Sequence, residues 1–214
     1  MVNRELILPI PVIILSTAVL LQLRLKSILL AIGYKSENIF FAETLIQANT
    51  ILEHHSASFA IIDLDLLQND GIGFIKSLKN YDPTIFILSV MSLQVKNSLL
   101  EALSSGATAY CFKEQDDMDI RSAIRTTIQG GAKIDPWVAQ QILLKFDEKQ
   151  AGISLNPAWS LNQTTLNEHE LEILNEVAMG YSNKEIAEHL EISVFTLDSF
   201  IKHIYQKLKY FIFQ

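Results

Sequence analysis

Short apolar runs alternate with amphipathic stretches along the first 130 residues. Five apolar runs have the length and composition of strands buried on both faces, and each is followed by a stretch with the three- and four-residue spacing of a helix. The strand runs are 12–16, 38–43, 59–65, 84–90 and 107–113, and the helical stretches are 18–32, 44–55, 71–80, 93–105 and 117–129. This alternation predicts a doubly wound α/β domain with a five-stranded, mainly parallel sheet and helices on both faces.

The first strand and helix lie in a segment that carries no charge from Leu6 to Leu23. An uncharged run of roughly 18 residues meets the length threshold for a membrane-spanning helix. Arg24 and Lys26 interrupt the run at one end, Pro9 and Pro11 lie at the other, and no small-x-small cleavage site follows. We therefore interpret the segment as a strand and a helix, with a membrane anchor and a secretory signal as the alternatives.

The helix that begins near Ala18 has an apolar face. Its predicted buried positions are Leu21, Leu25, Ile28, Leu29 and Ile32. Gln22, Arg24 and Lys26 are expected largely on the other face, and Gly33 supplies a stop.

After Gly130 and Gly131 the pattern becomes purely helical. Residues 135–146 predict a helix with Pro136 in its first turn, and the polar residues 147–165 predict a flexible connector. Three helical patterns then follow with short turns between them, at 168–180, 183–190 and 193–208.

Ser193 is the expected N-cap of the last helix. Helices joined by such short turns are typical of a helix-turn-helix, although any small three-helix bundle shares the pattern. We expect an α/β domain at 1–131, a linker with a helix at 132–164, and an all-α helix-turn-helix domain at 165–214.

The formal charge of −7 and the pI near 5.2 oppose nonspecific attraction to nucleic acid or anionic lipid over the whole surface, but leave room for a local binding patch. Cys111 is the one cysteine, which excludes an intramolecular disulfide and indicates a reducing compartment. Its apolar neighbours predict a core residue. The expected location is the cytoplasm, or the chloroplast stroma if the gene is plastid-encoded.

Particular strings in both halves resemble a known family. The stretch "ELEILNEVAMGYSNKEIAEHLEISVFT" resembles the LuxR-type DNA-binding module, and "IIDLDLLQNDGIGFIKSL", "FILSVMS" and "GATAYCFKEQD" resemble a receiver domain. The stretch "GGAKIDPWVAQQIL" resembles the segment that joins the two domains in NarL-type response regulators. The resemblance covers nearly the whole chain and implies a flavodoxin-like receiver followed by a LuxR-type helix-turn-helix.

The same resemblance implies a two-domain transcription factor. In such regulators, phosphorylation of a receiver aspartate alters dimerisation or frees the DNA-reading helix. The implied partners are double-stranded DNA, a sensor kinase or other regulatory protein, and a second copy of the chain.

The resemblance also assigns roles to receiver residues. Asp63, at the end of a central strand, is the expected phosphoryl acceptor. Ser89 is the expected hydroxyl at the end of the next strand, Lys113 the lysine that neutralises the phosphoryl group, and Tyr110 the aromatic switch residue.

One expected part is missing. Receivers bind Mg²⁺ with an acidic pair directly after the first strand, where this chain has Ser16 and Thr17. Asp63, with at most help from Asp65, should hold the ion much more weakly. We therefore expect an atypical receiver with no metal site; alternatively, Asp63 is a partly solvated carboxylate that pairs with Lys113.

The resemblance makes the last helix the DNA reader. The candidate contacts are Ser193, Thr196, Ser199 and Lys202, with Lys184 as a phosphate contact.

Several features depart from the family pattern. Asp198 and Phe200 stand where the family usually has lysine and histidine, and residues 166–214 hold four lysines against seven glutamates and one aspartate, a net −4. Family members also carry a fourth helix, whereas here an apolar tail of Tyr210, Phe211 and Phe213 precedes Gln214.

The sequence therefore predicts a DNA-binding transcriptional regulator with a phosphorylation-independent receiver. The alternative is an adaptor that binds proteins and not DNA. We predict no enzymatic activity, no catalytic residues and no cofactor, because the pairs at 54–55 and 169–170 lack the partner spacing of a metal site.

Overall fold

The computed structural model describes residues 7–65, 68–131, 134–152 and 166–212. The chain divides into two compact units, Met1–Gly130 and Gly131–Gln214. Each unit is described by itself below.

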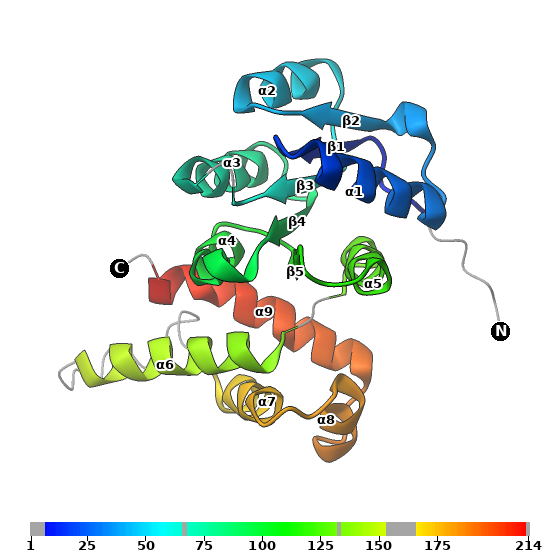
Figure 1. The fold of residues 1–214 in the computed structure, drawn as a ribbon. Helices are drawn as coiled ribbons and strands as arrows, with labels where there is room; N and C mark the ends of the chain where they lie inside the picture. Colours follow the sequence, from blue (N-terminus) through cyan, green and yellow to red (C-terminus); the bar gives the residue numbers. More distant parts are fainter. Residues whose placement is uncertain (1–6, 66–67, 132–133, 153–165, 213–214) are drawn as a thin grey trace. The chain divides into compact units, whose positions relative to one another are not determined.

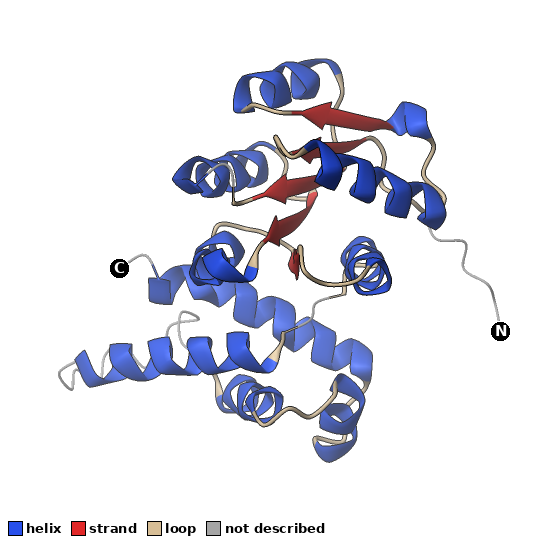
Figure 2. Ribbon diagram, in the orientation of Figure 1, coloured by secondary structure: helices blue, strands red, loops and turns tan. Residues whose placement is uncertain are grey.

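The first unit is built on a five-stranded parallel sheet (Figures 1 and 2). Its strands are β1 (Val12–Leu15), β2 (Ile39–Ala42), β3 (Phe59–Asp63), β4 (Phe86–Met91) and β5 (Ala109–Phe112). They lie in the order β2-β1-β3-β4-β5, and every neighbouring pair is parallel. The order reverses beside β1, so the carboxyl ends of β1 and β3 flank the crevice where such sheets collect their functional groups.

Helices cover both faces of this sheet (Figure 1). They are α1 (Val19–Ile32), α2 (Leu45–His54), α3 (Gln68–Tyr81), α4 (Leu99–Ser104) and α5 (Asp117–Ile128). Helices α1 and α5 pack together on one face, and α3 packs on α4 on the other. The doubly wound α/β fold predicted from the alternating pattern is therefore confirmed.

Two details of the first unit differ from the sequence prediction. The helix expected over 93–105 is split into a 3₁₀ segment, Leu93–Ser98, and α4, with Val95 outside helical backbone geometry between its neighbours. Gln22, expected away from the core, is 8% exposed, and its amide donates to the carbonyl oxygen of Ser16 at 2.5 Å. A buried amide is tolerated here because it is hydrogen-bonded.

The uncharged opening run is divided between β1 and α1, as the strand-and-helix interpretation requires. Across the described residues, none of the helices combines the length and the apolar character that a membrane crossing needs. The buried face of α1 contains Leu21, Leu25, Ile28 and Leu29.

Cys111 lies on β5 and is 1% exposed. Burial disfavours the charged thiolate and raises the pKa of Cys111 to about 12. The thiol is therefore a core residue, as predicted.

The second unit is helical. Its helices are α6 (Pro136–Gly152), α7 (Glu168–Ala178), α8 (Asn183–His189) and α9 (Val194–Ile212). Helix α6 packs on α7 and α9 and buries Val138, Ala139, Ile142 and Phe146. The helix that we predicted within a linker therefore belongs to this unit.

Helix α6 also continues to Gly152, so the connector predicted to begin at residue 147 does not do so. Residues 147–151 read Asp-Glu-Lys-Gln-Ala, and four of these five types are strong helix formers, which accounts for the continuation. The rest of the predicted connector, and the side chains of the apolar tail at 210–213, lie outside the described residues.

Replacing Leu25 by alanine should lower the free energy of unfolding by about 3 kcal/mol, because deleting a fully buried leucine leaves a cavity. Leu25 is 1% exposed, whereas Leu20 on the same helix is 83% exposed. Leu20→Ala should therefore change stability by less than about 0.5 kcal/mol. Urea unfolding followed by circular dichroism measures both; equal effects would contradict the packing of α1 on the sheet.

Candidate functional site

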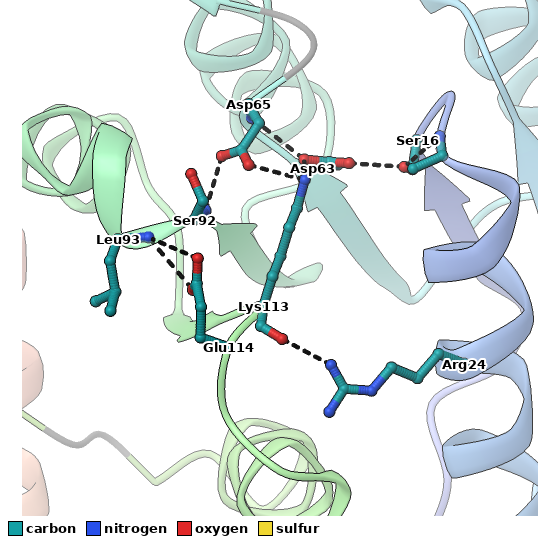
Figure 3. A network of polar contacts seen from close by, with 9 residues as sticks. Ser16, Arg24, Asp63, Asp65, Ser92, Leu93, Lys113 and Glu114 are labelled. Atoms are coloured by element: carbon teal, nitrogen blue, oxygen red, sulfur yellow. Dashed lines mark hydrogen bonds and ion pairs between the residues drawn. The ribbon is translucent and has the colours of Figure 1, made fainter.

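Three strand ends of the first unit meet at one cluster of polar side chains (Figure 3). Asp63 is the last residue of β3, Ser16 follows β1 directly, and Lys113 follows β5 directly. Because all the strands are parallel, these residues emerge at the same edge of the sheet.

The Asp63 side chain is 1% exposed, so its charge is compensated within the protein. The Lys113 ammonium lies 2.7 Å from Asp63 Oδ1, and the Ser16 hydroxyl donates to Asp63 Oδ2 at 2.7 Å. The backbone N–H of Asp65 donates to Oδ1 at 3.2 Å. The alternative interpretation, a partly solvated carboxylate paired with Lys113, is therefore correct in the pairing, but the carboxylate is buried and hydrogen-bonded on both oxygens.

Asp65 completes the cluster. Its Oδ2 lies 2.9 Å from the Lys113 ammonium, and its Oδ1 accepts from the backbone N–H of Ser92 at 2.8 Å. Every carboxylate oxygen of the two aspartates therefore has a donor, and one cation serves both carboxylates.

These contacts set the ionisation of Lys113. Its side chain is 22% exposed, and partial burial by itself would lower the pKa. Hydrogen bonds to Asp63 and Asp65 and their negative charges outweigh burial, so the pKa of Lys113 is raised above its usual value of 10.5. Lys113 is charged throughout the neutral range.

Arg24 holds the loop that carries Lys113 through hydrogen bonds to the loop backbone (Figure 3). Its guanidinium donates to the carbonyl oxygens of Lys113 at 2.7 Å and Gln115 at 2.5 Å, and Nε lies 2.6 Å from Asp117 Oδ1. The Gln115 side chain in turn accepts from the N–H of Phe112 at 2.9 Å. Hydrogen bonds from Arg24 on α1 therefore hold the β5–α5 loop, a contact that no local sequence pattern indicated.

Ser89 does not occupy the place we predicted for it. The last residue of β4 is Met91, and Ser89 lies one strand period earlier, paired beside Ile62. At about 3.3 Å per residue, Ser89 lies about 6.6 Å along the strand from Met91. Its hydroxyl is fully buried and has no hydrogen-bond partner, so it does not join the Asp63 cluster. Met91 ends the strand, and the residue that directly follows it is Ser92, whose backbone N–H donates to Asp65.

Tyr110 is half-buried on β5 and meets the ring of Phe112 edge-on, with ring centroids 5.8 Å apart. It lies at the strand position that the resemblance assigns to the aromatic switch.

A magnesium ion of the kind the resemblance implies does not fit these residues. Mg²⁺ requires several hard oxygen ligands. The Lys113 ammonium already pairs with an oxygen of Asp63 and of Asp65, and a neutral hydroxyl stands at Ser16. In the part of the chain that the structure describes, no group of three or more His, Cys, Asp or Glu side chains could hold a metal.

In the second unit, the predicted reading helix α9 packs one face inward. The buried residues of that face are Leu197, Ile201, Ile204, Tyr205 and Leu208. The Ser193 hydroxyl accepts from the N–H of Thr196 at 3.0 Å, which makes Ser193 the N-cap of α9 as expected.

The other predicted DNA contacts lie on the outer side of this unit. Ser199 and Lys202 are partly exposed on α9, and Lys184 on α8 is exposed with its ammonium 3.6 Å from Glu188. Asp198 lies near Lys202; burial raises the pKa of Asp198, and the positive charge of Lys202 opposes that shift.

A buried ion pair that we did not predict fixes α9 against α7. The Glu170 side chain is 2% exposed, and Lys207 approaches its two oxygens at 2.8 and 2.6 Å. Glu170 also accepts from the N–H of Asn167, in a capping box at the start of α7. The spacing of Asn167 and Glu170 signals such a box in the sequence but not the burial of Glu170, since Glu185 in the capping box at Ser182 is exposed.

Both units of the chain match known protein families. Residues 10–125 match the response regulator receiver domain, and residues 164–210 match the bacterial regulatory proteins of the luxR family. The oxygen regulatory protein NreC of Staphylococcus carnosus is 32% identical over 167 residues, 76% of this chain and 75% of NreC. The response regulator protein VraR of Staphylococcus epidermidis is 28% identical over 163 residues, 75% of this chain and 73% of VraR.

Solved structures agree on the fold. A structure of the RcsB response regulator from Salmonella typhimurium covers 92% of this chain and 91% of RcsB, with a TM-score of 0.50 and 24% identity. A structure of two RcsB dimers bound to two parallel DNAs covers 94% of this chain and 93% of RcsB, with a TM-score of 0.51 and 22% identity.

Replacing Lys113 by glutamine should cost about 3 kcal/mol of stability at neutral pH, because it leaves a buried carboxylate without its cation. The stabilisation from the charged Lys113 is fully present below its usual pKa of 10.5. It is lost as the pH rises through the raised pKa of Lys113 in the folded state. The stability difference between wild type and variant should therefore narrow in that alkaline range.

Denaturant unfolding at neutral and alkaline pH measures this difference. Lys76→Gln, at an exposed lysine of α3, is the matched control and should change stability by less than about 0.5 kcal/mol. A Lys113→Gln variant as stable as this control at neutral pH would show that the ion pairs do not compensate the Asp63 charge.

Proposed function

Because this chain belongs to the response regulators that join a receiver domain to a LuxR-type DNA-binding domain, we propose that it regulates transcription with a phosphorylation-independent receiver. The observation that carries the proposal is the closed hydrogen-bond network around Asp63. The Ser16 hydroxyl and the Lys113 ammonium occupy its two oxygens.

Phosphoryl transfer to a carboxylate needs positive charge that compensates the transferring group. Mg²⁺ ordinarily supplies most of that charge and must itself be held by anionic oxygens. Here a neutral hydroxyl stands directly after β1, at the position where the resemblance places an acidic pair. The absence of these anionic oxygens supports a receiver that takes up no phosphate.

The Asp63–Lys113 pair then has a structural role. It ties β3 to the β5–α5 loop and keeps one arrangement of that loop in the absence of phosphate. The receiver is left to act through contacts with a regulatory protein or with a second copy of the chain. Dimers of the similar RcsB bound to DNA support the second copy as a partner.

Incubation with acetyl phosphate and Mg²⁺ tests the proposed receiver. The wild-type chain should acquire no acid-labile phosphate, because its site lacks the oxygens that hold the ion. The double variant Ser16→Asp, Thr17→Asp restores an acidic pair and should acquire phosphate, and adding Asp63→Asn should remove it again. Intact-protein mass spectrometry measures the phosphate; stoichiometric phosphate on Asp63 of the wild type would overturn the proposal.

A second experiment tests the proposed DNA binding. The whole chain selects its preferred duplex from a random-sequence pool, and binding to that duplex is then measured. Lys202→Ala should weaken binding and reduce the salt dependence by about one unit of slope, the loss of one phosphate contact. Lys35→Ala, at an exposed lysine of the receiver unit, removes the same charge and should leave the slope unchanged. Fluorescence anisotropy at several salt concentrations measures both.

The net charge of −4 over residues 166–214 favours a second function. If no duplex is bound at low salt, the chain is an adaptor whose two domains bind proteins.

A further inference from the structure

Helix α9 exposes a large aromatic side chain at its amino-terminal end. Phe195 is 79% exposed and its neighbour Val194 is 45% exposed. A phenylalanine in water contributes nothing to the core, and Phe195→Ala would therefore be nearly neutral for folding. The exposed ring is available for contact with a binding partner.

The position of Phe195 on the helix indicates what it meets. Ser199 and Lys202 follow it by four and seven residues, so the three lie on one face of α9. The buried residues, such as Leu197 and Ile201, lie on the other side. Phe195 therefore begins the face on which we predict the DNA contacts.

The polar groups of this end are already engaged within the helix. The Ser193 hydroxyl caps the helix and lies 2.8 Å from the Thr196 hydroxyl. The Ser199 hydroxyl donates to the carbonyl oxygen of Phe195 at 3.0 Å. From Ser193 to Ile201 the helix carries no lysine or arginine, so its first two turns cannot form the bidentate contact that reads guanine.

We propose that Phe195 reads thymine through the 5-methyl group in the major groove. This inference rests on the proposed DNA-binding function and specifies its sequence preference. The amino-terminal residues of a reading helix contact base edges, and thymine is the base that presents an apolar group there. A phenylalanine ring buries that methyl group from water without needing a hydrogen bond.

A protein partner fits this surface less well. Stable protein interfaces bury about 1,200–2,000 Å², with an apolar centre. Phe195 instead stands on a face whose other members, Ser199 and Lys202, are polar or positively charged. Positive charge beside an isolated apolar contact is complementary to a methylated base flanked by phosphates.

The test compares thymine with uracil, which differs from it only in lacking the methyl group. The whole chain first selects its preferred duplex from a random-sequence pool, and each thymine of that duplex is then replaced singly by uracil. At the contacted position, binding should weaken about fourfold, the equivalent of one buried methyl group of about 0.8 kcal/mol at 1.4 kcal/mol per tenfold.

Phe195→Ala assigns the effect to this residue. The variant should bind the thymine and uracil duplexes equally, while Met179→Ala, at a methionine that is 74% exposed in the same unit, should keep the wild-type preference. Unchanged thermal unfolding verifies that both variants are folded.

The outcomes separate the two proposals. A chain that selects no duplex at low salt overturns the DNA-binding function and this inference with it. A chain that binds DNA but tolerates uracil at every position overturns this inference alone. Retained thymine preference in Phe195→Ala likewise shows that another group reads the methyl.

Discussion

A carboxylate removed from water must be compensated where it lies, and the end of β3 in this protein is organised by that requirement. Asp63 is 1% exposed, and both of its oxygens are satisfied by groups that arrive from β1, from β5 and from its own strand. Lys113 can reach it because Arg24 holds the backbone of the β5–α5 loop. The arrangement of the end of β3 and the β5–α5 loop thus depends on neutralising the buried charge of Asp63.

Both halves of the chain depart from the family pattern at positions where the resemblance expects a charged group. In the receiver, the hydroxyl of Ser16 stands directly after β1, where the resemblance places an acid. In the predicted reading helix, Phe195 is 79% exposed and Asp198 stands where a lysine is usual. The proposed phosphorylation-independent receiver and a predicted reading helix with few cations fit a regulator controlled through protein contacts and shape more than through charge.

The hydrophobic pattern was sufficient to predict the α/β fold, because buried parallel strands and amphipathic helices have different periods. It also placed Asp63 and Lys113 near each other, since consecutive parallel strands end at one edge of the sheet. It could not place Ser89 correctly: strand ends are uncertain by a residue or two, and one strand period separates Ser89 from Met91. Arg24 and Glu170 were missed because their partners are distant in the sequence, and Gln22 because its amide reaches back to the carbonyl of Ser16, a contact that the helical period does not encode.

The position of Cys111 gives the receiver an internal reporter. Its thiol, on strand β5, is buried in the core against residues of α1 and α5. A pKa of about 12 leaves almost no reactive thiolate at neutral pH. A thiol-specific reagent can therefore modify the intact chain only during moments when β5 separates from its surroundings. The rate of such labelling would follow the opening of this domain directly, without an introduced probe, and would record whether a bound partner tightens or loosens it.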